Sequence, residues 1–239
     1  MTMIVRNLQQ VRDRITTACM AAGRLPGSVR LLAVSKTFAA DAVVEAAADG
    51  QQAFGENYIA EGVEKILALG DLQASVQGVS AGLLEWHCIG PVQSNKTRLV
   101  AEHFHWVQSI DRLKTAQRLS DQRPPARFPL QVCLQVNTDG GVNKSGVMPE
   151  EAHALAREVA RLPGLVLRGL MTIPEPSPGF EHACRLHARA KALFDDINAK
   201  GDLPQPLDTL SMGMTADLEA AIHAGSTMVR VGTAIFGIR

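Results

Sequence analysis

The stretch Arg30-Leu-Leu-Ala-Val-Ser35 decides the fold class of this chain. Its four consecutive apolar residues, 31–34, are typical of a strand that is buried on both faces, as in a parallel sheet covered by helices. An alanine-rich segment at 39–49 follows with helical character and ends at Gly50, a residue type favoured just after a helix. The chain therefore contains an early β–α unit, preceded by an amphipathic helix predicted over 4–22.

The same alternation of short apolar runs and helical segments continues to the end of the chain. Further strands are predicted at 52–55, 84–89, 104–109, 130–137, 165–171, 207–211 and 227–231. Further helices are predicted near 57–69, 94–102, 111–120, 149–161, 180–199 and 215–224. Strict β–α alternation implies a parallel sheet with right-handed crossovers. Eight units favour a single (β/α)8 TIM barrel with an extra N-terminal helix, and an open doubly wound sheet is the alternative.

Length and charge narrow the class of protein. The chain has 239 residues, close to the roughly 250 of a typical (β/α)8 barrel, so we expect one domain over 1–239. Lysine and arginine total 24, as do aspartate and glutamate. A chain with no net charge lacks the basic footprint that nucleic acids or anionic lipids require, so neither is an expected partner.

Cysteines and apolar segments indicate the compartment. The four cysteines lie far apart and form no CxxC pair, so we expect reduced thiols rather than disulfides or a zinc ribbon. The N-terminal residues contain no apolar core of a signal peptide, and no 18-residue apolar run predicts a membrane span. His103 and His105 have no third candidate ligand, so no metal site is expected. We expect a cytoplasmic protein, with a mobile polar loop at 70–83.

Lys36 is the first residue with candidate chemistry. In a barrel, the active site lies at the carboxyl ends of the strands, and Lys36 directly follows the first strand. Partial desolvation at a barrel mouth lowers the pKa of a lysine and supplies the neutral amine that attacks an aldehyde. The alternative is a solvated lysine that opens the next helix.

The segments after the seventh and eighth predicted strands are candidate binding sites for an anion. The loops after the seventh and eighth strands commonly bind phosphate in barrels, through backbone N–H groups and a helix N-terminus. Ser211 and Thr215 offer hydroxyl groups after strand seven, and we expect Thr215 to cap the helix that follows. Gly232 allows close backbone approach after strand eight, and Thr233 adds a hydroxyl group. Ordinary helix capping and a tight turn are the alternative explanation.

Six stretches carry a resemblance to a known family. They are LLAVSKTF (31–38), FGENY (54–58), HCIGPVQSNK (87–96), VNTDGGVNKSG (136–146), RGLMTIP (168–174) and SMGMTADLEAAIHAGSTMVRVGTAIFG (211–237). They span almost the whole chain, and the last is long and specific. The sequence resembles the YggS/PROSC-type pyridoxal phosphate homeostasis proteins, whose fold is related to the N-terminal barrel of alanine racemase.

The resemblance implies a site for pyridoxal 5′-phosphate (PLP) and assigns roles to its residues. The positions that match cofactor-binding residues are Lys36, Asn57, Ser211, Arg230, Gly232 and Thr233. Lys36 matches the lysine that forms the Schiff base, and Arg230 matches the arginine that faces the pyridine nitrogen. Ser211, Gly232 and Thr233 match phosphate ligands.

Other matched positions are less informative. Asn57 matches a cofactor-site asparagine whose contact is not specified. His87, Asn95 and Lys96 match a family motif, but the sequence does not reveal its role. Thr215 stands where serine is expected, and it retains the hydroxyl.

The resemblance further implies a PLP-binding homeostasis protein without catalytic turnover. Arginine does not give up its proton to the pyridine ring, which leaves the ring a poorer electron sink. The related racemases add a β-domain that supplies a tyrosine acid/base, whereas this chain ends at Arg239 and its single tyrosine is Tyr58. A PLP-dependent amino-acid racemase is the alternative. We expect a monomer, with apo-forms of PLP-dependent enzymes as candidate partners.

Overall fold

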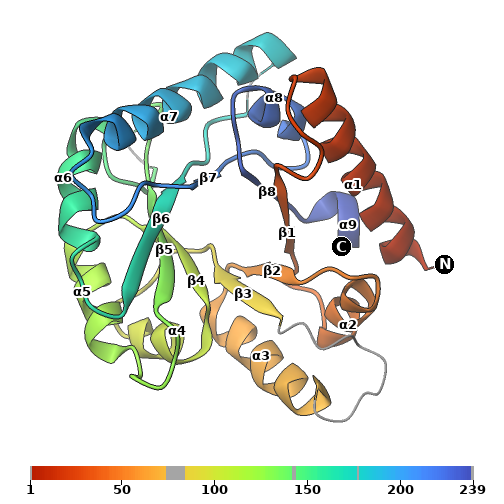
Figure 1. Ribbon diagram of the computed structural model, residues 1–239. Coiled ribbons are helices and arrows are strands. Elements are labelled where there is room, and N and C mark those ends of the chain that lie inside the picture. Colours follow the sequence, from red (N-terminus) through yellow and green to blue (C-terminus); the bar gives the residue numbers. More distant parts are fainter. Residues whose placement is uncertain (1, 74–83, 142–143, 177, 238–239) are drawn as a thin grey trace.

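Eight parallel strands form a closed barrel in the computed structural model, which describes residues 2–73, 84–141, 144–176 and 178–237. The strands follow one another around the barrel in chain order, and β8 pairs with β1 (Figure 1). Their bounds are β1 Arg30–Val34, β2 Ala53–Glu56, β3 Glu85–Cys88, β4 Trp106–Ile110, β5 Leu130–Gln135, β6 Leu165–Met171, β7 Thr209–Ser211 and β8 Met228–Val231. The prediction of a (β/α)8 barrel is confirmed, and closure excludes the open sheet.

Helices surround the barrel and connect successive strands (Figure 1). Their bounds are α1 Met3–Ala21, α2 Ala40–Ala48, α3 Ile59–Gln73, α4 Thr97–His103, α5 Leu113–Gln122, α6 Pro149–Val159, α7 Phe180–Lys200, α8 Leu218–His223 and α9 Thr233–Phe236. The amphipathic helix α1 buries Leu8, Val11 and Ile15 and packs against α8 and α9. The predicted extra N-terminal helix is therefore confirmed.

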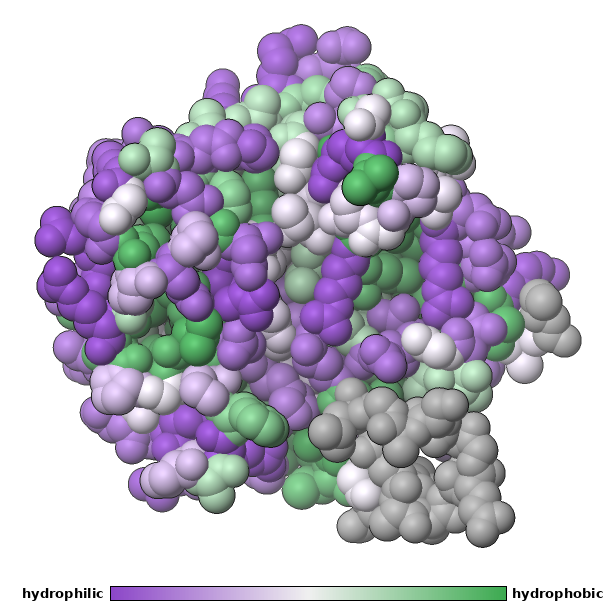
Figure 2. Space-filling view, in the orientation of Figure 1, coloured by the Kyte–Doolittle hydropathy of each residue, from purple (hydrophilic) through white to green (hydrophobic). Residues whose placement is uncertain are grey.

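The core has two layers, one on each side of the strands. Inside the barrel, Leu32, Ala53 and Met228 form one apolar cluster. Outside it, residues such as Phe54 pack in the main cluster between the strands and the helices. Both faces of the strands are thus covered, which explains apolar runs such as residues 31–34 of β1. Figure 2 shows hydrophilic residues, in purple, over much of the outer rim of the molecule.

The structure differs from the sequence prediction at two segments. Helix α3 extends to Gln73, so 70–73 are helical where a loop was predicted, and 74–83 lie outside the described residues. The predicted cap at Thr215 is wrong, because 215–217 form a turn and α8 starts at Leu218 with Asp217 at its N-cap. Among the described residues, no helix is long and apolar enough to cross a membrane.

Candidate functional site

A pocket of about 510 Å3 opens at the carboxyl ends of the strands. Five of the six predicted site residues line it: Lys36, Asn57, Arg230, Gly232 and Thr233. They come from the ends of β1, β2 and β8. The barrel therefore brings together residues that are nearly 200 positions apart in the chain, in the place where barrels carry their active sites.

Lys36 and Asn57 occupy one side of this pocket. Lys36 is exposed, directly after the buried strand β1, and Asn57 is half-buried after β2. The backbone of Asn57 packs on Gly90, where an added Cβ would lie 2.2 Å from the Asn57 carbonyl oxygen. A side chain at Gly90 would therefore displace Asn57, a constraint that only the three-dimensional structure reveals.

Gly232 and Thr233 line the pocket next to the end of β1, between β8 and α9. A Cβ on Gly232 would lie 3.1 Å from the Val34 carbonyl oxygen, so the backbone of β8 and that of β1 approach closely here. The Thr233 side chain is exposed in the pocket wall. The first N–H groups of a helix have no acceptor within that helix, which leaves donors near Thr233 for an anion.

Arg230 supplies a fixed positive charge. It is 4% exposed and still lines the pocket. Its Nη1 donates to the Ser211 hydroxyl at 2.8 Å and its Nη2 donates to the Thr172 carbonyl oxygen at 2.8 Å. Burial lowers the pKa of Arg230 to about 10, so the guanidinium stays protonated at neutral pH.

Ser211, the sixth predicted residue, is fully buried, and the residues that line the pocket from this part of the chain are Met214, Thr215 and Ala216. The Ser211 hydroxyl accepts from Arg230 and donates to Gln108 Oε1 at 2.7 Å. Ser211 therefore contacts the site through Arg230, and Thr215 is the hydroxyl-bearing residue after β7 that lines the pocket.

The hydrogen bonds continue from Ser211 through the barrel interior to β3. Gln108 Nε2 lies 2.9 Å from His87 Nδ1, and His87 Nε2 lies 2.6 Å from Glu85 Oε1. Burial lowers the pKa of His87 to about 4, so its ring is neutral at pH 7. A neutral His87 that donates to Glu85 must accept from Gln108, and every donor in the chain then points from Arg230 toward Glu85.

This series of hydrogen bonds gives His87 a role that the sequence left open. Burial is the largest influence on Glu85 and opposes its ionisation, but the hydrogen bond from His87, the positive charge of Arg30 and the other contacts together outweigh burial and lower the Glu85 pKa to about 2. The carboxylate also pairs with Arg30 at 2.7 Å. Asn95 and Lys96, the other motif residues, lie at the start of α4 and are not among the described residues that line the pocket.

Hydrogen bonds from residues that the sequence did not point to stabilise the loop between β7 and α8. Asp217 accepts from the Met214 N–H at 2.7 Å and lies 2.9 Å from His187 Nε2. Burial would raise the pKa of Asp217, but these hydrogen bonds lower it. Arg14 of α1 donates to the Thr215 carbonyl oxygen at 3.0 Å. Two distant helices, α1 through Arg14 and α7 through His187, thus fix the loop that carries Thr215.

The arrangement combines an exposed amine, a buried cation, and backbone and hydroxyl donors around one cavity. An amine can condense with an aldehyde, and the donors suit an anionic group. The site therefore fits a small ligand that carries both an aldehyde and a phosphate.

Comparison with known proteins gives consistent matches over the full chain. The family model described as "Alanine racemase, N-terminal domain" matches residues 5–239. The pyridoxal phosphate homeostasis protein of Pseudomonas aeruginosa is 54% identical, with 100% of this chain and 97% of the relative covered. PipY of Synechococcus elongatus, solved with PLP bound, is 33% identical with a TM-score of 0.80, and the match covers 98% of this chain and 100% of PipY.

A second solved structure is closer in shape. An unknown protein from Bifidobacterium adolescentis is 36% identical with a TM-score of 0.89, and the match covers 98% of this chain and 94% of that protein. Family model, curated relative and solved structures agree over nearly the full length. The chain belongs to the pyridoxal phosphate homeostasis protein family, within the wider family of the alanine racemase N-terminal domain.

Proposed function

We propose that this protein binds PLP in the pocket at the carboxyl ends of the strands, holds it as a Schiff base on Lys36, and serves PLP homeostasis without catalytic turnover. The observation that carries the proposal is the convergence of Lys36, Arg230 and the Gly232–Thr233 backbone on one cavity. The PLP-bound structure of PipY, whose match covers 98% of this chain, supports the same ligand.

The residues in the pocket fit the parts of the cofactor. PLP supplies an electrophilic aldehyde on an electron-withdrawing ring. The Lys36 amine is placed for the aldehyde, and Arg230 for the ring nitrogen. The close backbone approach at Gly232, with the hydroxyl groups of Thr233 and Thr215, suits the phosphate. We further propose that Asn57 contacts the cofactor, and that Ser211 positions Arg230 rather than binding the phosphate directly.

Arg230 also argues for a non-catalytic role. A group with a pKa of about 10 stays charged and donates at neutral pH, so it leaves the ring nitrogen without a proton. An unprotonated ring stabilises a carbanion poorly, and carbanion chemistry is what racemases and transaminases require.

Reduction with borohydride followed by peptide mapping tests the proposal. We expect the protein with PLP to absorb visible light, and the reduced pyridoxyl group to appear on Lys36. Lys36→Ala should abolish both signals. A label on another lysine, or an unchanged spectrum in Lys36→Ala, would refute the attachment site.

We further propose that the protein forms one domain over 1–239, acts as a monomer in the cytoplasm, and delivers PLP to apo-enzymes. All four cysteines are free, as expected of reduced thiols in a reducing compartment. Delivery predicts that bound PLP reaches an apo-enzyme faster than it dissociates into buffer. Transfer that never exceeds the dissociation rate would contradict delivery, while leaving the binding proposal intact.

A further inference from the structure

Three side chains behind Lys36 form a cluster that contacts the residues on both sides of it. Lys65 of α3 donates through Nζ to the Ser35 carbonyl oxygen at 2.8 Å and to Glu56 Oε1 at 2.8 Å. It also donates to Glu61 Oε1 at 2.7 Å. A lysine ammonium has three donors, so all three are used.

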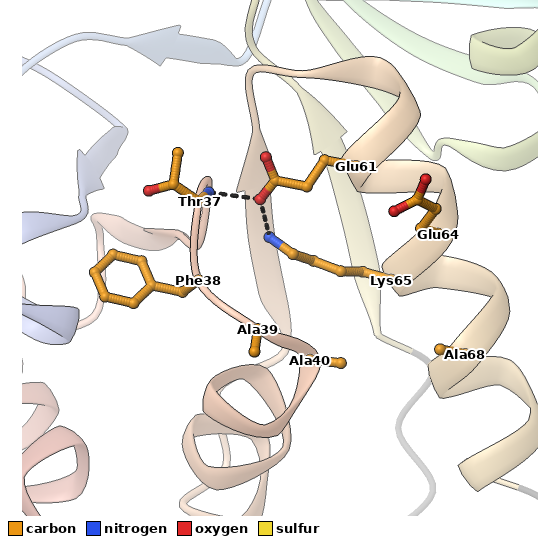
Figure 3. Close-up of a pocket in the computed structure, with 8 residues that line it drawn as sticks. All are labelled: Thr37, Phe38, Ala39, Ala40, Glu61, Glu64, Lys65 and Ala68. Atoms are coloured by element: carbon orange, nitrogen blue, oxygen red, sulfur yellow. Dashed lines mark hydrogen bonds and ion pairs between the residues drawn. The ribbon is translucent and has the colours of Figure 1, made fainter. Parts of the chain in front are cut away.

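The same carboxylates bind the segment 35–37 directly. Glu56 Oε1 accepts from the Ser35 hydroxyl at 2.6 Å, and Glu61 Oε1 accepts from the Thr37 N–H at 2.5 Å. Figure 3 shows Glu61 between Thr37 and Lys65, with Lys65 reaching from α3 toward the segment that follows β1. The residues before and after Lys36 are therefore both tied to one ionic cluster.

The backbone at this point needs such support. Thr37 has a φ of +67°, a left-handed conformation that is a genuine outlier for a β-branched residue. Conformations of this kind persist only where the surroundings over-determine them, and they concentrate at functional sites. Glu61 therefore accepts a hydrogen bond from the backbone N–H of the strained residue itself.

Stability alone does not explain the cluster. Lys65 is 6% exposed and Glu56 is fully buried, yet Glu56 Oε2 has no hydrogen-bond partner among the described residues. A buried ion pair is often no more stabilising than a well-packed apolar pair of the same volume, so its presence calls for another role.

We propose that Glu56, Glu61 and Lys65 form a positioning clamp, which fixes the backbone at 35–37 so that the Lys36 amine is presented to the aldehyde of its ligand. The inference rests on the proposed function. The three are positioning residues, because their contacts are with Ser35 and Thr37 rather than with the pocket that holds the cofactor. Loss of the clamp should slow covalent attachment at Lys36 and leave noncovalent recognition of phosphate and ring unchanged.

Glu61→Ala is the most direct variant, because it frees the Thr37 N–H and leaves the buried Lys65–Glu56 pair intact. Glu64→Ala is the matched control: Glu64 lies one turn along α3 and, with Glu61 and Lys65, lines a second pocket, beside residues 37–40, but it makes none of the clamp's hydrogen bonds (Figure 3). Glu61→Gln keeps an acceptor oxygen for Thr37 and serves as the conservative rescue. The double variant Lys65→Met with Glu56→Gln removes both buried charges together, so that neither is left unpaired.

Two ligands separate positioning from general damage. The attachment rate is measured by borohydride trapping of PLP on Lys36, and noncovalent affinity by titration with 4′-deoxypyridoxine 5′-phosphate, which lacks the aldehyde. We expect Glu61→Ala and the double variant to slow trapping at least tenfold, with affinity for the deoxy ligand changed less than twofold. Glu64→Ala should match the wild-type protein, and Glu61→Gln should recover most of the rate.

Trapping in Glu61→Ala at the rate of Glu64→Ala would overturn the clamp, and so would an equal loss of both readouts. If wild-type Lys36 is not labelled, the proposed function fails instead. The clamp is then judged on the apo-protein by hydrogen exchange at the Thr37 amide. That amide should exchange at least tenfold faster in Glu61→Ala than in Glu64→Ala, and equal exchange would refute the clamp.

Discussion

At the scale of single residues, Gly232 is the most demanding position of the site. A Cβ there would lie 3.1 Å from the Val34 carbonyl oxygen and 3.4 Å from Val34 Cβ, while φ is −115°, which any residue can adopt. We expect Gly232→Val to lower PLP affinity at least 100-fold without unfolding the barrel, because the added side chain enters the pocket. Equilibrium titration, with circular dichroism as a check on folding, measures this.

Gly70→Val serves as its control, because a Cβ at Gly70 meets no atom within 4 Å. The control should bind PLP like the wild-type protein. Normal binding by a folded Gly232→Val protein would mean that the phosphate lies elsewhere.

The phosphate should dominate affinity. Charge-assisted hydrogen bonds contribute about 1.5–3 kcal/mol each, so two of them near Thr233 would favour PLP over pyridoxal by a factor on the order of 100 or more. Ser211→Ala should lower the affinities for PLP and for pyridoxal by the same modest factor, because Ser211 contacts Arg230 and not the phosphate in the proposed site. Parallel titrations with PLP and pyridoxal decide this. Equal affinities in the wild-type protein would refute the phosphate site, and a PLP-selective loss in Ser211→Ala would restore Ser211 as a direct ligand.

A site residue could be predicted from the sequence where its position in the chain, or the family resemblance, indicated its role. Lys36, Arg230 and Gly232 stand at strand ends, and the resemblance supplied their roles, so their shared pocket was foreseeable. The orientation of the Ser211 side chain was not, because it depends on Gln108, 103 positions away in the chain. Such a contact leaves no local pattern.

At the scale of elements, strands such as β1 and β5 were located because burial on both faces favours short, mostly apolar segments. The start of α8 was misplaced because Asp217 binds both His187 and the Met214 N–H, and these contacts hold 215–217 as a turn. Local capping preference favoured Thr215, and a tertiary contact overrode it. The four-residue helix α9 was missed because so short a segment shows no periodicity.

Strand β3 should make the fold sensitive to acid. The pKa of His87 is about 4 in the folded protein against an ordinary 6.5, so the unfolded chain binds more protons between these values. Stability therefore falls as pH drops from 6.5 to 4, by about 3 kcal/mol from this group. The Glu85 pKa of about 2 adds a further loss below pH 4.5. Urea denaturation at a series of pH values measures the slope.

His87→Gln is the matching variant, since it cannot gain a proton in this range. It should be less stable at pH 7, because the hydrogen-bond chain is altered, and its stability should fall less steeply between pH 6.5 and 4. Some slope remains from His105, whose pKa is also lowered by burial. A slope equal to that of the wild-type protein would contradict a neutral, buried His87.

At the scale of the whole molecule, closure of the barrel creates the site. The β1–β8 pairing sets Leu32 beside Arg230 and Ala33 beside Val231. Lys36, which follows β1, therefore lies near Gly232, which follows β8. The sequence supplies eight strands, but only closure makes the first and the last neighbours. The number of β–α units already favoured a barrel over an open sheet, and the pairing of β8 with β1 confirms that prediction.

The whole barrel also determines what the bound cofactor can do. Arg230 is held by Thr172 of the loop after β6 and by Ser211 of β7, and through Ser211 it is linked to β4 and β3. In the proposed arrangement, in which Arg230 faces the ring nitrogen, a cation held by so many strands cannot move aside to let that nitrogen gain a proton. We therefore expect no measurable racemisation, transamination or decarboxylation of single L-amino acids by the PLP-loaded protein. Chiral chromatography should detect no D-isomer above the level of Lys36→Ala with free PLP. Turnover at the roughly 1–10³ s⁻¹ of ordinary enzymes would show that Arg230 does not suppress carbanion chemistry and would favour the racemase alternative.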